Sequence, residues 1–161
     1  MAGAPSWTLY EHPLFTRQRE ALERAVAAAR DKHPERYGDS ADAKLLAAIA
    51  KLTLDLIPAD PGGPQFRQGG TLGKARKHWF RAKFGSGRYR LFYQFSSQAK
   101  VIIYAWVNDA HTLRTYGSKR DAYAVFKAML EKGDPPDEWS DLIKAVSGSA
   151  IKSEGNKKQR R

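Results

Sequence analysis

Two short runs joined by a glycine-rich turn decide the fold: Trp79–Phe84 has the sequence WFRAKF and Arg88–Phe95 has RYRLFYQF, with Gly85-Ser86-Gly87 between them. Aromatic residues alternate with arginine and lysine, a pattern typical of half-buried strands, and the turn predicts an antiparallel β-hairpin. Ser96-Ser97-Gln98 makes a second tight connection into Lys100–Val107. This third run is apolar on both faces, which predicts a central strand covered on both sides.

The segments before and after these strands have apolar residues at helical spacing. We expect two helices before them, with apolar positions over 15–29 and 45–56, and two after them, over 118–132 and 139–146. Thr16 is the candidate N-cap of the first helix, and Pro58 is expected to end the second. The order predicts an α+β fold, a small antiparallel sheet with an N-terminal helical pair and C-terminal helices.

The length of 161 residues suits one domain. We expect this domain over 1–151, with a helical N-terminal extension over 1–60 and the sheet core and C-terminal helices over 61–151. The remaining segment, 152–161, is basic and has one acidic residue and no apolar residue after Lys152, so we expect a disordered tail.

Composition excludes several classes of protein. The chain has no cysteine, which excludes a disulfide scaffold, a thiolate zinc site and a cysteine nucleophile. No apolar run is long enough for a membrane span, and Met1–Tyr10 lacks the pattern of a secretory signal, so a cytoplasmic protein without membrane contact is expected. The sequence has no Walker loop, no dinucleotide fingerprint and no histidine pair at metal spacing, so we expect no cofactor and no metal.

The positive charge is concentrated in the middle of the chain. The formal net charge is +11, but residues 1–60 have 8 basic and 9 acidic side chains, whereas residues 61–108 have 9 basic side chains and no aspartate or glutamate. A surface that only needs solubility mixes both signs. An acid-free stretch of this length indicates contact with a polyanion, and the alternative is a basic, solvated face with no ligand.

The strands concentrate these cations on particular faces. Trp79, Arg81 and Lys83 share one face of the first strand, and Arg88 and Arg90 share one face of the second. A turn of two or four residues places Lys83 and Arg90 on the same face of the sheet, whereas a turn of three separates them. The residues alone leave this choice open.

A site with arginine, lysine and tyrosine but no carboxylate indicates one kind of chemistry. RNA can be cut by its own 2′-hydroxyl, so the protein needs only proton transfer and stabilisation of a dianionic phosphorane. DNA lacks this hydroxyl and would not be cut. Among the histidines, His78 has a functional claim because it lies among basic residues, whereas His12 and His33 are expected in surface loops.

The stretch from Trp79 to Phe92 resembles the core of the YhaV-family toxins, a branch of the RelE-like toxin–antitoxin ribonucleases. The runs Val101–Asp109 (VIIYAWVND) and Thr112–Gly117 (TLRTYG) continue the resemblance, as do Asp121-Ala122-Tyr123 and the opening Trp7–Pro13 (WTLYEHP). The match extends in the same order from about Trp7 to Leu142.

The resemblance implies an active site of basic residues on adjacent strands, a later arginine and a tyrosine of the C-terminal helix. By position, the catalytic candidates are Arg81, Lys83, Arg90, Arg114 and Tyr123, with Arg90 as the residue that stabilises the phosphorane. Arg120 is an alternative to Arg114, and Tyr116 to Tyr123. Candidates for RNA binding are Arg67, Lys77, His78, Trp79, Arg88, Tyr116 and Arg120.

The resemblance also implies a function and partners. We expect an mRNA interferase that cleaves mRNA on the ribosome without a metal and leaves a 2′,3′-cyclic phosphate and a 5′-hydroxyl. The expected partners are RNA and a PrlF-type antitoxin, through which the toxin would meet operator DNA. The alternative is a protein that binds RNA or the ribosome through the same basic face without cutting.

Overall fold

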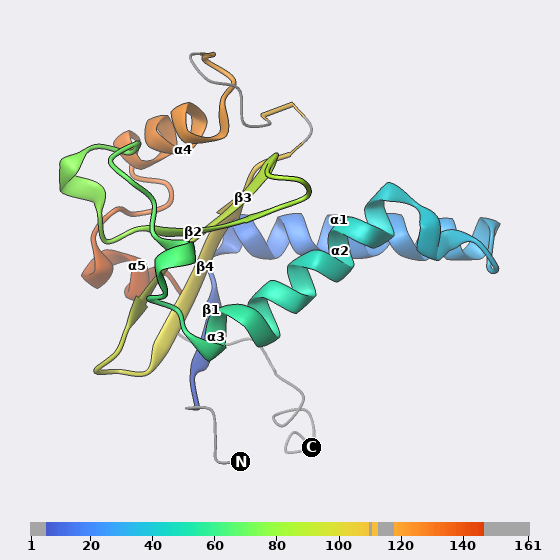
Figure 1. Ribbon diagram of the computed structural model, residues 1–161, viewed down its shortest axis with the longest axis horizontal. Coiled ribbons are helices and arrows are strands. Elements are labelled where there is room, and N and C mark those ends of the chain that lie inside the picture. Colours follow the sequence, from blue (N-terminus) through green and yellow to red (C-terminus); the bar gives the residue numbers. More distant parts are fainter. Residues whose placement is uncertain (1–5, 110, 113–117, 147–161) are drawn as a thin grey trace.

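The computed structural model describes residues 6–109, 111–112 and 118–146. One sheet contains β1 (Thr8–Glu11), β2 (Phe80–Phe84), β3 (Tyr89–Ser96) and β4 (Val101–Val107) in the order β1–β4–β3–β2 (Figure 1). β2 pairs with β3 and β3 with β4 in antiparallel fashion, as predicted. The predicted α+β fold is confirmed.

β1 is a strand that the sequence analysis missed. It pairs with β4 in parallel, with Leu9 opposite Ile102 and Glu11 opposite Tyr104. Four residues are too few for a clear period-2 pattern, and the partner lies about ninety residues away, so no local spacing signals the pairing. Because β1 covers the outer edge of β4, β4 becomes a central strand, as its apolar sequence predicted.

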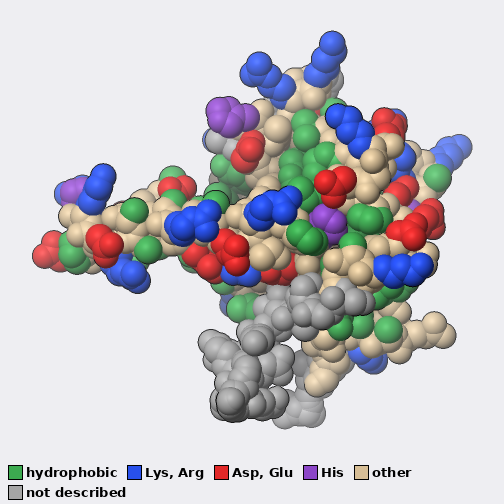
Figure 2. All heavy atoms as spheres, turned by 180° about the vertical axis from the view of Figure 1, so that it is seen from behind, with side chains coloured by type: hydrophobic (Ala, Val, Ile, Leu, Met, Phe, Trp, Pro, Cys, Tyr) green, Lys and Arg blue, Asp and Glu red, His purple; other side chains and the backbone are tan. Residues whose placement is uncertain are grey.

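Helices cover both faces of the sheet. α1 (Pro13–Lys32) and α2 (Ala41–Lys51) lie side by side and extend beyond the sheet as an arm, while α4 (Ala122–Glu131) and α5 (Trp139–Val146) lie on the other side (Figure 1). Acidic and basic side chains are mixed along the arm (Figure 2). Within the described part of the chain, no helix combines the length and apolarity needed to cross a bilayer.

Two apolar cores hold these layers together, one on each face of the sheet. The core under α1 and α2 contains Leu9, Phe15, Ile49, Leu52, Ile57, Phe66, Ala82, Leu91, Tyr93, Ile102, Tyr104 and Val107. The core under α4 and α5 contains Leu72, Trp79, Phe92, Ile103, Ala105, Trp106, Tyr123, Phe126, Leu130, Leu142 and Val146. The two strands β3 and β4 therefore contribute alternate residues to opposite cores, whereas the apolar residues of β2 belong to the core under α1 and α2.

The start of α1 differs from the prediction. His12, not Thr16, is the N-cap: its Nδ1 accepts a hydrogen bond from the backbone N–H of Leu14 at 3.1 Å, and Pro13 occupies the first helical turn. Thr16 instead donates its hydroxyl hydrogen to Glu11 at 2.8 Å. The expectation that His12 is a surface residue is wrong, since it is 5% exposed, and burial lowers its pKa.

The end of the second helix also lies further along the chain than expected. α2 continues through a π-helical turn, Leu52–Leu56, into a last turn, α3 (Ile57–Ala59), so Pro58 lies inside the helical segment. The N–H of Ile57 bonds to the carbonyl of Leu52, five residues back. This wider turn accommodates Pro58, which has no N–H to donate, and the helix ends one residue after it.

Candidate active site

The turn between β2 and β3 settles the register that the sequence left open. Four residues, 85–88, separate the strands, and Lys83 lies directly opposite Arg90. Gly85, Ser86 and Gly87 all have positive φ, between 59° and 81°, a conformation that glycine adopts without strain. The even turn therefore places Lys83 and Arg90 on one face of the sheet, together with Arg81 two residues before Lys83.

Two arginines of this face meet at one tyrosine. The hydroxyl oxygen of Tyr123 accepts a hydrogen bond from Nε of Arg81 at 3.0 Å and another from Nε of Arg90 at 3.3 Å. The Arg90 guanidinium also lies over the Tyr123 ring, 5.7 Å from its centroid. The structure thus brings together three of the predicted catalytic residues, from β2, β3 and α4.

The N-terminus of α4 fixes the position of Tyr123. The helix begins at Ala122, and the Asp121 carboxylate caps it by accepting the N–H of Tyr123 at 2.9 Å. The ring then packs edge-on against Phe92 of β3, at 5.5 Å between centroids. The predicted helix start near Ser118 is therefore wrong by about one turn, because the capping carboxylate is that of Asp121.

Arg90 is a buried cation held by neutral groups. It is 6% exposed, and its guanidinium donates to the carbonyl of Gly87 as well as to Tyr123. Its backbone N–H donates to the side-chain oxygen of Asn108 at 2.6 Å. Among the described residues, no carboxylate forms an ion pair with Arg90. A buried, uncompensated guanidinium favours the binding of an anion.

Three further basic candidates are exposed, unlike Arg90. Lys83 and Arg88 are exposed at the end of the hairpin, and neither has a carboxylate partner within the described ranges. Arg120 is exposed, and its backbone N–H donates to Ser118. Arg114 and Tyr116, the two alternatives in the preceding loop, lie outside the described residues.

Trp79 and His78 are held by a carboxylate that the sequence analysis did not single out. Asp137 accepts the indole N–H of Trp79 at 2.8 Å and lies 3.1 Å from both Nε of Arg76 and Nε2 of His78. Trp79 is fully buried, so its ring has no free surface for contact with RNA, and the prediction that Trp79 binds RNA is wrong. The large aromatic ring is needed in the core, where it packs edge-on against Phe126 at 4.9 Å.

Two further functional candidates emerge only from the structure. Asn108 is buried at the end of β4, and besides accepting from Arg90 it donates to the carbonyls of Arg88 and Thr112 at 3.1 and 2.9 Å. It therefore joins the Arg90 strand to the loop that follows β4. Asp121 acts through the cap of α4. A polar residue directly after an apolar strand, and an aspartate directly before a helix, are the signals that could have indicated them.

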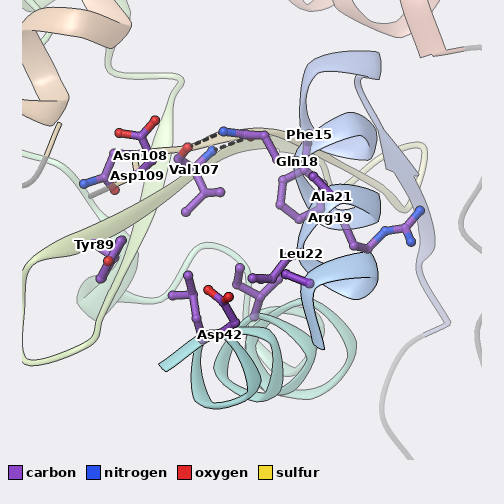
Figure 3. A pocket seen from close by; sticks show the side chains of 13 residues that line it. Phe15, Gln18, Arg19, Ala21, Leu22, Asp42, Tyr89, Val107, Asn108 and Asp109 are labelled. Atoms are coloured by element: carbon purple, nitrogen blue, oxygen red, sulfur yellow. Dashed lines mark hydrogen bonds between the residues drawn. The ribbon is translucent and has the colours of Figure 1, made fainter. Parts of the chain in front are cut away.

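A hollow of about 400 Å³ lies on the opposite face, between α1, α2 and the ends of β3 and β4 (Figure 3). Its lining is mainly apolar, and Gln18 closes one wall by exchanging hydrogen bonds of 2.6 and 3.1 Å with the backbone of Val107. Arg19 at this hollow is paired with Glu11 and Glu23. Arg81 and Arg90, on the other face, have no carboxylate partner among the described residues.

The arrangement defines a class of protein: an α+β domain with a basic site on its sheet, whose arginines form no ion pair with a carboxylate among the described residues and suit a phosphodiester substrate. Residues 9–147 match the sequence model of the YhaV toxin family, described as a toxin with endonuclease activity, of a toxin–antitoxin system. The chain belongs to this family.

Two curated relatives agree with the family match. The chain is 48% identical to the Ribonuclease toxin YhaV of Escherichia coli K12 over 139 residues, which cover 86% of this chain and 90% of the relative. It is 47% identical to the Toxin YhaV of Escherichia coli O6:H1 over 144 residues, 89% of this chain and 94% of the relative. No solved structure matches the chain. The matches confirm the family that the sequence resembled and the class of enzyme, a nuclease toxin.

Proposed function

We propose that this toxin is an mRNA interferase that cleaves RNA by attack of the 2′-hydroxyl on the adjacent phosphate. The observation that carries the proposal is the pair of Arg81 and Arg90 at Tyr123, with Lys83 opposite Arg90, in which no cation has a carboxylate partner within the described part of the chain. The relative named a ribonuclease toxin supports RNA as the substrate.

The charges of the reaction fit this cluster. When the 2′-oxygen attacks phosphorus, the phosphate gains one negative charge and becomes a phosphorane dianion, and it then expels the 5′-oxygen to leave a 2′,3′-cyclic phosphate. Arg90 is held in place by neutral acceptors, so its guanidinium is aligned before the substrate arrives. We assign it the stabilisation of the phosphorane, with Arg81 as its neighbour on the substrate.

Lys83 and Tyr123 take different roles. Lys83 is exposed and opposite Arg90, so its amino group lies where it can reach the phosphate. As the free amine it accepts the proton of the attacking 2′-hydroxyl, and as the resulting ammonium it donates that proton to the leaving 5′-oxygen. Tyr123 is 5% exposed and accepts hydrogen bonds from both arginines, so we assign it the alignment of the two guanidinium groups. Neutralisation of the phosphorane by these cations makes a divalent metal unnecessary.

The cellular context is part of the same proposal. We infer that the substrate is mRNA on the translating ribosome in the bacterial cytoplasm. The inhibitor would be a PrlF-type antitoxin, and the toxin would reach operator DNA only through it. The arm formed by α1 and α2 is left for contacts with the antitoxin or the ribosome, because the proposed chemistry uses residues of the sheet and α4.

Induced expression in a bacterium without antitoxin tests this function. We expect wild type to arrest growth and to create new 5′ ends in transcripts. Lys83→Ala should reduce both effects, whereas Lys44→Ala, which removes the same charge from an exposed position of α2, should leave them unchanged. New ends that persist at the wild-type level in Lys83→Ala would contradict the assigned site. Ribosome binding without new ends would favour an RNA-binding protein that does not cut.

A further inference from the structure

A basic hollow lies at the free edge of the sheet, along β2. Its volume is about 380 Å³, and it is lined by Arg67, Gln68, Gly69, Lys77 and Phe80. β2 is the outermost strand, and Arg67 forms an antiparallel bridge with Phe80 along its open side. The segment before β2 thus folds back along the strand and forms one wall of the hollow.

Arg81 connects this hollow to the active site. It follows Phe80 in β2, and its side chain lies on the active-site face, where Nε donates to Tyr123. A terminal nitrogen of the same guanidinium donates to the carbonyl of Gln65 at 3.0 Å, in the segment that leads to Arg67. One arginine therefore contacts both the tyrosine of the cluster and the wall of the hollow, so the two sites are neighbours along the β2 edge.

The charge of the hollow suits a phosphate. Arg67 and Lys77 are both exposed, and neither has an ion-pair partner in the described ranges of the chain. No aspartate or glutamate lines the hollow. Two cations from different segments that converge without a carboxylate repel each other until an anion binds between them, and a phosphodiester group provides that anion.

The remaining wall residues suit a base. Phe80 is half-buried and offers an aromatic surface of the kind on which bases stack. Gln68 is 6% exposed, and its amide orientation follows from its partner: the carbonyl of Arg76 can only accept, so the Gln68 nitrogen faces it, at 2.8 Å. The Gln68 amide oxygen is then buried without a partner among the described residues. A ligand that presents an N–H group would supply the missing donor.

We propose that this hollow, the Arg67–Lys77 pocket, binds one nucleotide of the RNA next to the cleaved position: phosphate on Arg67 and Lys77, base on Phe80 and the Gln68 amide. The proposal rests on the proposed RNA substrate. The proposal predicts that affinity for RNA increases once the oligonucleotide is long enough to occupy both the cluster around Arg90 and the pocket. The increase is expected because each occupied subsite adds its own contacts.

Binding of non-cleavable RNA tests the pocket without requiring catalysis. Full-length protein is titrated, by fluorescence anisotropy, with 2′-O-methyl oligonucleotides that grow from two to six nucleotides on either side of one reference dinucleotide. For wild type we expect a fall in Kd of about tenfold or more at one particular extension. Arg67→Gln/Lys77→Gln should abolish that step and leave the affinity of the dinucleotide unchanged.

The matched control removes two exposed charges outside the pocket. Lys44→Gln/Lys74→Gln has the same net charge as the pocket variant, and one of its sites, Lys74, lies on the same connecting segment. We expect it to retain the affinity step. Equal loss of the step in both variants would show a nonspecific effect of charge, and retention of the step in the pocket variant would also overturn the proposal.

Base selection at the subsite gives a second readout. Gln68→Met keeps the size of the side chain and removes the amide. We therefore expect discrimination among the four bases to fall at the nucleotide that enters the pocket, and the base preference at the other nucleotides to stay unchanged. Unchanged discrimination would overturn the assignment of Gln68. If the wild-type protein does not cleave RNA, that result contradicts the proposed function and not the pocket.

Discussion

Arg19 and Arg90 are two arginines packed against opposite faces of the same sheet, and their partners differ in kind. Arg19 of α1 donates to the buried carboxylate of Glu11 and to Glu23, and the hydrogen bond to Glu11 is the main reason that its pKa is raised. Arg90 of β3 has a tyrosine, a carbonyl and no carboxylate among the described residues. A cation neutralised by the protein contributes to stability, whereas one held by neutral acceptors remains available for a substrate.

The same division applies to whole regions. Acidic and basic residues are mixed along the α1–α2 arm, and the acid-free stretch 61–108 supplies the proposed active-site face of β2 and β3. A carboxylate near Arg90 would compensate its charge and repel a phosphate. The absence of aspartate and glutamate from this stretch is therefore explained by the anionic substrate that its cations are placed to bind.

Substitution of Arg90 and of Arg19 should give the largest difference in kcat/KM. Arg90→Ala is expected to lower kcat/KM about 1,000-fold, because it removes a preorganised donor to the phosphorane. Arg19→Ala should leave kcat/KM of the folded protein unchanged. Initial rates on one RNA substrate measure both effects. An Arg90→Ala enzyme within about tenfold of wild type would remove Arg90 from the catalytic residues.

Tyr123→Phe should have the next largest effect. The substitution keeps the ring against Phe92 and removes the oxygen that both arginines contact, so we expect kcat to fall about 10- to 100-fold with little change in KM. Tyr37→Phe, at the far end of the arm, is the matched control and should change neither constant. Rates measured over a range of RNA concentrations separate kcat from KM, and an increase in KM alone would contradict an aligning role.

The paired arginine should affect stability rather than catalysis. Arg19→Met removes the two hydrogen bonds that the Arg19 guanidinium donates to the Glu11 carboxylate, which is 4% exposed, and we expect the free energy of unfolding to fall by about 1–3 kcal/mol. Arg19→Met/Glu11→Gln should recover part of the loss, since the second substitution removes the charge that Arg19 balanced. Urea titrations provide both values. A double variant no more stable than Arg19→Met would show that the pair is not coupled in this way.

The smallest effect concerns His12, next to Glu11 in the chain. Burial lowers its pKa below the usual 6.5, against the opposing effect of Asp134. The unfolded chain therefore binds a proton more readily than the folded one, so the contribution of His12 to stability is complete above pH 6.5 and is lost as the pH falls through the lowered pKa. His12→Asn keeps a capping oxygen without titrating. Its unfolding midpoint should depend less on pH between 7 and 5 than that of wild type, and an equal dependence would contradict this assignment.

The hairpin and its basic residues could be predicted because they depend on local patterns. Alternation along β2 and β3 predicted the strands, and the resemblance identified Arg81, Lys83, Arg90 and Tyr123, which the structure brings to one face. The even turn had to be observed, because Gly85-Ser86-Gly87 fits more than one turn length.

The contacts that sequence reasoning missed join residues far apart in the chain. β1 pairs with β4, and Asp137 binds Trp79 from almost sixty residues away. Trp79, an RNA-binding candidate by sequence, is therefore a core residue. The capping role of His12 was hidden because histidine is an uncommon N-cap, whereas Thr16 belongs to a preferred residue type. In each of these cases tertiary contacts overrode a local preference.

The chemistry of the cut is the most direct test of the central claim, that cations without an ion-pair partner among the described residues promote attack of the RNA's own 2′-hydroxyl. An mRNA with a mapped cleavage position is prepared with and without a single 2′-deoxy nucleotide at that position, and both are offered to wild-type toxin free and on translating ribosomes. We predict cleavage of the unmodified RNA, with 2′,3′-cyclic phosphate and 5′-hydroxyl ends, and no cleavage at the deoxy position. Cleavage at the deoxy position, or products with 5′-phosphate ends, would contradict the account.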